Sequence, residues 1–176
     1  MDKGDYQMTK LMLKGGLCLA AFAVGIAQPV QAGMSCWDQN QIAAAKIRDL
    51  QSRLMVATMR CRAIGMDVLP AYNEFVRVNR STIQDANGLI KAQFKSGFGD
   101  ELAQKSYDSF TTSLANAYGA DATSAEVCEE KAELAAEAVA AGGDIARLLD
   151  IANRLGSAPE VPGGRCPVTF ASVAAE

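Results

Sequence analysis

The sequence contains no histidine, and this absence excludes more chemistry than any other feature of the chain. Histidine is the most common general base and the most common zinc ligand in proteins. A Ser-His-Asp catalytic triad and a histidine-ligated haem are therefore excluded. The sequence also has no Cys-x-x-Cys pair and no glycine-rich phosphate loop, so we expect no cofactor and no metal site.

The chain also lacks an excess of basic residues and any strand-like alternation. Its 17 basic and 20 acidic residues give a net charge of −3, so nucleic acid is not expected as a partner. No segment alternates between apolar and polar residues over the length of a strand, and no internal repeat is present. The sequence therefore predicts an all-α protein.

An export signal is the clearest feature that is present. Lys10 and Lys14 precede an apolar run from Gly15 to Ala27, and the small residue Ala32 ends a cleavage site. The alternative, an uncleaved membrane anchor, needs about 20 apolar residues, and this run is shorter. We therefore predict a periplasmic or secreted protein without a stable membrane span after cleavage. The predicted divisions are a signal peptide over 1–32, a helical domain over 33–157 and an irregular tail over 158–176.

Apolar positions spaced by three and four residues predict long helices. In the clearest of them, one stripe runs from Ile47 to Ile64, with Asp38 as the N-cap and Gly65 as the stop. Caps and glycines bound three further segments, at about 70–96, 100–118 and 124–155. Gly142 and Gly143 interrupt the last segment, which we expect to be kinked or split. Short connections favour antiparallel neighbours, so we predict an up-down four-helix bundle.

Four cysteines follow the signal, and the bundle selects one of their three possible pairings. In an up-down bundle Cys36 and Cys166 lie at one end, whereas Cys61 and Cys128 lie at the other. We therefore predict disulfides Cys36–Cys166 and Cys61–Cys128, with the second one buried. Structural disulfides are favoured over reactive thiols because an exported chain meets an oxidising environment.

Charge is distributed unevenly along the chain. Residues 38–95 hold nine basic and five acidic side chains, whereas residues 96–176 hold five and thirteen. Solvated helix faces are the favoured interpretation. The functional alternative is a basic surface for an anionic partner, formed by Arg53, Arg60, Arg62, Arg77 and Arg80.

Three further features each allow a structural and a functional interpretation. Trp37 either covers one end of the bundle or is an exposed contact residue. Met55 and Met59 could bind Cu(I), although core packing is favoured for such a pair. A row of glutamates between Glu126 and Glu137 could supply paired carboxylates, but a solvated helix face is favoured.

The aromatic side chains are expected in the core. They share the inward stripes of the second and third predicted helices, and the alternative is a cavity for a small apolar ligand. The residues are Tyr72, Phe75, Phe94, Tyr107, Phe110 and Tyr118. A glycosylation sequon at Asn79 lies within a predicted helix and carries little weight.

Several short stretches resemble those of small exported bacterial helical proteins with four cysteines and no assigned activity. They are Cys36-Trp37, Leu54-Met55-Val56-Ala57, Cys61-Arg62 and residues 111–119. The resemblance implies export and helicity and supplies no catalytic residue.

We therefore predict a non-catalytic module that binds a protein of the cell envelope. The expected contact residues are Trp37, Arg53, Arg60, Arg77 and Arg80. The first alternative is a carrier that holds a small apolar ligand in the core of the bundle. An enzyme of unknown type is ranked third, after the binding module and the carrier. No set of nucleophile, base and orienting group can be assembled from the sequence.

Overall fold

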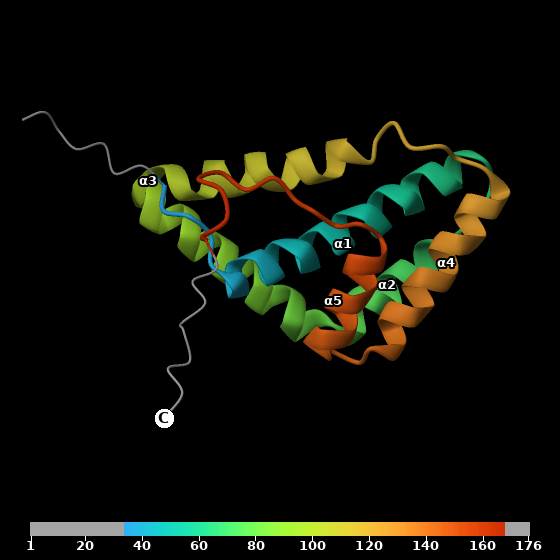
Figure 1. Ribbon diagram of the computed structural model, residues 1–176. Helices are drawn as coiled ribbons and strands as arrows, with labels where there is room; N and C mark the ends of the chain where they lie inside the picture. The colour runs from blue at the N-terminus through green and yellow to red at the C-terminus, as the bar shows by residue number, and fades with distance from the viewer. Residues whose placement is uncertain (1–33, 168–176) are drawn as a thin grey trace, which may run out of the picture. The chain divides into compact units, whose positions relative to one another are not determined.

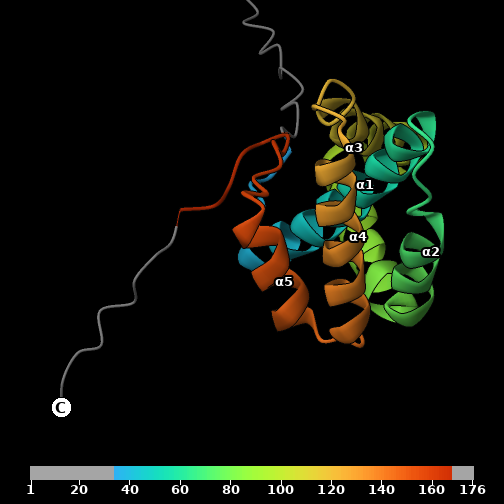
Figure 2. The same cartoon turned by 90° about the vertical axis from the view of Figure 1, so that its right-hand side faces the viewer.

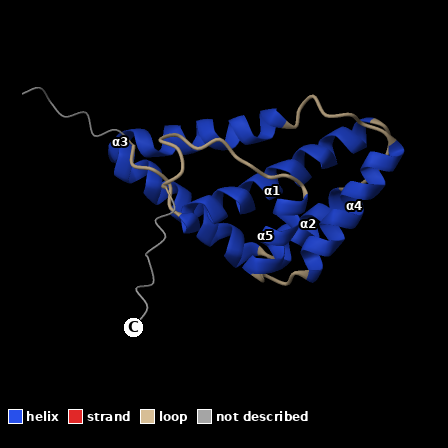
Figure 3. Ribbon diagram, in the orientation of Figure 1, coloured by secondary structure: helices blue, strands red, loops and turns tan. Residues whose placement is uncertain are grey.

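The computed structural model describes residues 34–167, and every regular element in this range is a helix (Figures 1 and 3). The described residues form α1 (Gln39–Ala63), α2 (Leu69–Val78), α3 (Arg80–Ala117), α4 (Ala125–Ala140) and α5 (Ile145–Arg154). The all-α prediction is confirmed. The predicted signal over 1–32 and the last nine residues of the tail lie outside the described range, and none of the described helices is long and apolar enough to cross a membrane.

Local sequence signals set both ends of α1. Asp38 and Gln41 form a capping box, in which each side chain accepts a hydrogen bond of 2.8 Å from the backbone N–H of the other residue. At the other end Gly65 has a φ of 83°, a left-handed conformation that glycine adopts without steric cost. The predicted cap and stop are both confirmed.

The second predicted helix differs, because it is divided at Asn79. Asn79 is fully buried, and its side-chain amide donates to the carbonyl oxygens of Phe75 and Ala138, both at 2.9 Å. Its side-chain oxygen accepts from the N–H of Gly143 at 2.8 Å. The backbone of Asn79 leaves helical geometry, with φ −98° and ψ 20°, and α2 ends where α3 begins. A buried asparagine with these three bonds is not accessible as a glycosylation site.

Glycine produces the other breaks in the helical pattern. Gly99, with φ 77° and ψ 171°, bends α3 into two limbs, residues 80–98 and 100–117, close to the predicted boundary. Gly142 and Gly143, both with positive φ, separate α4 from α5, so the predicted division of this segment is confirmed. The described chain therefore has five helices, and the four-helix count does not hold.

α1 is the central helix of the described domain. It packs most extensively against α3 and also contacts α5, while α4 lies between α2 and α5 (Figure 2). The buried side chains form one main core in which the largest members come from α1, α2, α3, α5 and the segment before α1. These are Trp37, Ile47, Leu50, Leu54, Phe75, Ile90, Phe94, Leu148 and Ile151.

The four described cysteines form the two predicted pairs. The Cα atoms of Cys36 and Cys166 are 4.8 Å apart, and those of Cys61 and Cys128 are 5.7 Å apart, both suited to a disulfide. Cys61 and Cys128 are buried in a small cluster of their own with Val68. Two such pairs indicate an oxidising environment outside the cytoplasm.

Candidate functional site

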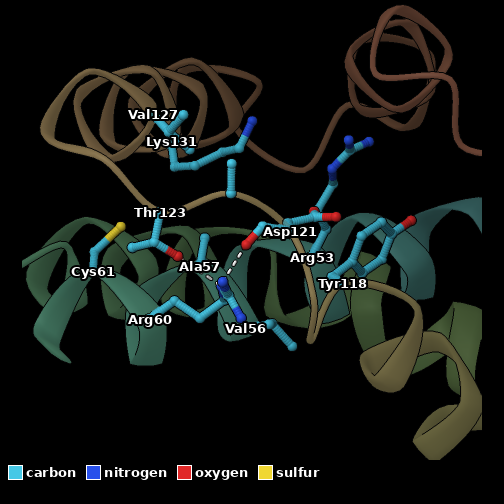
Figure 4. Close-up of a pocket in the computed structure, with 11 residues that line it drawn as sticks. Arg53, Val56, Ala57, Arg60, Cys61, Tyr118, Asp121, Thr123, Val127 and Lys131 are labelled. Carbon is cyan, nitrogen blue, oxygen red and sulfur yellow. Dashed lines mark hydrogen bonds between the residues drawn. The ribbon is translucent and has the colours of Figure 1, made fainter.

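Arg53 and Arg60, expected to face a partner, instead anchor loops to α1. Arg53 Nη1 donates to the carbonyl oxygen of Leu155 at 2.5 Å, and the guanidinium lies over the ring of Tyr118 with 4.9 Å between its carbon and the ring centroid. Arg60 Nε donates to Thr123 Oγ1 at 2.9 Å, and its two terminal nitrogens donate to backbone carbonyls of the α3–α4 loop (Figure 4). These bonds occupy all three nitrogens of Arg60, whereas Arg53 makes one hydrogen bond and its buried Nε has no partner. The structure therefore gives both arginines a role in holding loops and does not single them out as partner contacts.

The other three arginines of the predicted basic surface, Arg62, Arg77 and Arg80, do not form one continuous surface. Arg77 is exposed, but its guanidinium is paired with both carboxylate oxygens of Glu74, at 2.8 and 2.5 Å. Arg80 is exposed at the start of α3, and Arg62 is exposed at the end of α1. The five arginines are thus divided between loop anchors and separate surface positions.

The crevice between Arg53 and Arg60 is a narrow junction. It lies between α1, the α3–α4 loop and α4, and Figure 4 shows Lys131 and Val127 above it and Val56 below. Its cavity volume is about 30 Å³, which is room for roughly one water molecule. Lys131 points its ammonium group to Glu130 at 2.7 Å. The crevice therefore holds a loop in place and has no space for an organic ligand.

Asp49 forms a buried polar network that the sequence analysis did not identify. The hydroxyl of Tyr118 donates to the Asp49 carboxylate at 2.8 Å, and Ser157 Oγ donates to the same carboxylate at 2.5 Å. Burial, together with the hydrogen bond to Asp49, strongly raises the pKa of the Tyr118 hydroxyl, so Tyr118 remains a donor. The network fixes the start of the C-terminal tail to α1 and α3.

Trp37 is a cover for the core, and its assignment as a contact residue is corrected. Its side chain is only 1% exposed and packs on Phe94 and Phe110, with ring centroids 5.6 and 5.7 Å away. The indole N–H donates to the carbonyl oxygen of Pro162 at 2.7 Å. This burial depends on the tail, which crosses over the indole, and no local signal around Trp37 contains that information.

An apolar surface groove lies beside this cover. We define the α3 groove by its apolar residues Phe94, Phe98, Leu102, Phe110, Val161 and Pro162, which line an open hollow of about 680 Å³ between the limbs of α3 and the tail. Lys105 and Glu160 add charge to its lining. The rings of Phe94 and Phe98 are stacked, with centroids 6.2 Å apart.

Two side chains of the α3 groove are unusually exposed for their type. Phe98 is 42% exposed and Leu102 is 50% exposed, and they flank the bend at Gly99. Exposed apolar groups that gather in a hollow indicate a contact surface, whereas isolated ones do not. The sequence analysis placed Phe94 and Phe110 in the core, which is confirmed, but it did not identify Phe98 or Leu102.

The glutamate row and the methionine pair show no arrangement of ligands. Glu126, Glu130 and Glu133 are exposed on α4, as a solvated face requires, and Glu137 pairs with Arg154. Met59 is largely exposed. Among residues 34–167, no group of three or more acidic or cysteine side chains could hold a metal ion.

We compared the chain with known protein families, curated proteins and solved structures. No family model, curated protein or solved structure matches the chain. The α3 groove and the segments that frame it are therefore the features of the described residues that point to a function.

Proposed function

We propose that the protein is a periplasmic, non-catalytic module that binds another envelope protein through the α3 groove. The exposure of Phe98 and Leu102 beside the stacked Phe94 ring carries this proposal. Aromatic and aliphatic anchors in a hollow supply most of the binding energy in many protein interfaces. Lys105 and Glu160 give the groove a charged lining that can fix the orientation of a partner.

The scaffold beneath the groove suits a docking module. The proposal includes removal of residues 1–32 and treats the five helices as an antiparallel up-down bundle. In that bundle α2 and the first limb of α3 take the place of one long helix, and α4 and α5 take the place of another. The two cysteine pairs join the segments at either end of α1, which supports a surface that changes little on binding.

A carrier of a small apolar ligand is the second candidate. Its ligand site would be the α3 groove and not the core of the bundle. The crevice beside Arg53 admits only about one water, whereas the α3 groove has a volume within the range of small-molecule sites, about 300–1,000 Å³.

Site-specific cross-linking tests the protein partner. A photo-crosslinking amino acid replaces Phe98 in one variant and Leu89 in another, and both are exported in cells and illuminated. Leu89 is the matched control because it is 45% exposed on the same helix and does not line the groove. We expect an adduct with one envelope protein from position 98 and none from position 89.

A double substitution checks the same surface without a cross-linker. Phe98→Ser with Leu102→Ser should abolish co-purification of the protein identified in the adduct, whereas Leu89→Ser should retain it. Leu89→Ser should melt close to the unsubstituted protein, because isolated surface substitutions change stability by about 0.5 kcal/mol or less. Circular dichroism should show that the double variant keeps its helices, although it loses the contact of Phe98 with Phe94. Equal adducts at both positions, or a native mass spectrum with a small molecule that denaturation releases, would contradict the protein-partner proposal; the second result favours the carrier.

A further inference from the structure

The two disulfides lie in different surroundings. Cys61 and Cys128 are 2% and 0% exposed and are enclosed by Val68 and its neighbours. Cys36 and Cys166 are only half-buried and stand at the edge of the described domain, where the tail returns to the start of α1. A thiol reagent can therefore approach Cys36 and Cys166 without opening the helical core.

The tail between α5 and Cys166 is a strap without helical structure. We define the strap as residues 156–167. Ser157 holds its first part through the bond to Asp49 and through its own N–H, which donates to the carbonyl oxygen of Ala152 at 2.9 Å. This end is attached to α1 and α5, deep in the domain.

The far end of the strap is residues 161–167. Its described hydrogen bonds to residues outside the strap all involve Trp37. The Trp37 N–H donates to Gly164 at 2.8 Å, the Cys166 N–H donates to Trp37 at 2.9 Å, and the indole donates to Pro162. Gly163 lies directly on the residues before Trp37, since a Cβ there would be 2.9 Å from the carbonyl oxygen of Met34. The far end thus has hydrogen bonds to a short non-helical segment, one covalent bond, and the apolar contact of Val161 with the main core.

The strap also forms one wall of the α3 groove. Glu160, Val161 and Pro162 line the groove opposite the second limb of α3. They lie between the anchored Ser157 and the covalently held Cys166, and Val161 also packs against the main core, so their position depends on both ends of the strap and on this one apolar contact.

We propose that the Cys36–Cys166 disulfide is a redox latch that holds the strap and so sets the shape of the α3 groove. Reduction releases the far end of the strap from Trp37 and removes the wall at Glu160–Pro162, while Cys61–Cys128 remains oxidised. The inference that loss of this wall changes partner binding rests on the proposed function of the groove. The inference that reduction releases the strap does not rest on that function.

The reductant is a dithiol, either a small molecule or the active site of a thiol–disulfide oxidoreductase. One of its thiolates attacks Sγ of Cys36 or Cys166, the S–S bond breaks, and the other cysteine leaves as a thiolate that takes up a proton. The second thiol of the reductant, as its thiolate, then attacks the reductant's own sulfur in the mixed disulfide. The attached cysteine leaves as a thiolate and takes up a proton. Two electrons pass to the protein, which gains two thiols, and the dithiol becomes a disulfide.

Graded reduction of the exported, signal-free protein tests the latch. Dithiothreitol is added without denaturant, the thiols formed are alkylated, and the labelled cysteines are mapped by mass spectrometry. We expect Cys36 and Cys166 to be labelled at least about tenfold faster than Cys61 and Cys128, because access governs the rate of exchange. Labelling of all four at one rate, or of Cys61 and Cys128 first, would overturn the proposal.

The single tryptophan of the chain reports on the strap in the same samples. When only Cys36–Cys166 is reduced, Trp37 should become accessible to acrylamide, its emission should move to longer wavelength, and helical circular dichroism should stay unchanged. Binding of the apolar dye anilinonaphthalene sulfonate should change as well. An unchanged Trp37 signal and unchanged dye binding after selective reduction would overturn the latch.

Serine pairs provide controls that need no reductant. Cys36→Ser with Cys166→Ser should reproduce the Trp37 signal of the selectively reduced protein and should not respond to dithiothreitol. If this variant does not fold, the graded reduction of the unsubstituted protein still decides the proposal.

The cross-linking variant at Phe98 separates the latch from the proposed function. A Trp37 response without any adduct in either redox state would contradict the partner function and leave the latch intact. An adduct without a Trp37 response to reduction would contradict the latch and leave the partner function intact.

Discussion

Two irregular segments of this protein are fixed by buried side chains in different ways. The two-glycine corner between α4 and α5 is held by Asn79, whose three hydrogen bonds join it to α2, α4 and the corner, and by Thr82, whose hydroxyl donates to the carbonyl oxygen of Gly143 at 2.8 Å. The far end of the strap is held by Trp37, which combines aromatic packing with a single side-chain hydrogen bond and has a disulfide beside it.

The difference follows from the length of the segments. A short corner has few backbone groups to satisfy, so one amide side chain can supply a partner for its buried N–H. A strap of a dozen residues has a larger conformational entropy to lose, which apolar packing and a covalent link offset. The corner therefore serves stability, whereas the strap also creates an apolar surface.

Asn79→Ala should have the largest effect on stability. It leaves the N–H of Gly143 and the carbonyl of Ala138 without their partner, and each unsatisfied buried group costs about 1–3 kcal/mol. We expect a loss of about 2–4 kcal/mol in urea unfolding with the disulfides intact. Asn73→Ala, at an exposed position on α2, is the control and should change stability by less than about 0.5 kcal/mol. Similar losses for both variants would remove the special role of Asn79.

Trp37→Phe should cost less, because the aromatic packing is largely retained. The phenyl ring can still contact Phe94 and Phe110, but the hydrogen bond to Pro162 is lost and a cavity forms. We expect thermal unfolding, followed by circular dichroism, to show a loss of about 1–3 kcal/mol. An unchanged melting temperature would mean that the disulfide alone positions the strap.

Tyr118→Phe should have the smallest effect at neutral pH and a distinct effect at high pH. The pKa of Tyr118 is raised in the folded protein, first by burial and then by the Asp49 carboxylate. In the unfolded chain its proton is lost near pH 10, so the folded state holds that proton more tightly. This contribution to stability is fully present below about pH 10 and is lost as the pH rises toward the folded pKa.

The measurement is urea unfolding between pH 8 and 11 on both proteins. At neutral pH we expect Tyr118→Phe to lose about 1–2 kcal/mol, from the missing hydrogen bond to Asp49. Above pH 10 stability should fall less steeply in the variant. The difference in slope should stay below about 1.4 kcal/mol per pH unit, the value for one proton, because the ring is partly exposed and solvent screens its charge interactions. Parallel alkaline slopes would contradict the raised pKa.

Much of the fold could be predicted because its signals are local. Asp38, Gly65 and Ser124 each act within one helical turn of their own position, and the structure uses them as caps or stops. The cysteine pairing followed from which helix ends meet, so it survived the change from four helices to five.

The features that sequence reasoning missed depend on distant partners. Asn79 interrupts a helical pattern only because Ala138 and Gly143, about sixty residues later, provide and require hydrogen bonds. Arg60 looked like a free cation until the α3–α4 loop surrounded it with carbonyl oxygens. Phe98 and Leu102 line a groove only because α3 bends between them and the strap returns beside them.

The connectivity of the cysteines has a consequence for biogenesis. The 61–128 bond lies inside the loop closed by the 36–166 bond, with sequence separations of 67 and 130, so Cys36 pairs with the last of these four cysteines and not with Cys61, the next one along the chain. A chain that is oxidised while it emerges N-terminus first meets Cys61 as the first partner for Cys36. Pairing in that order gives two wrong bonds, and the native protein then requires an isomerase or oxidation that waits until the helices have met.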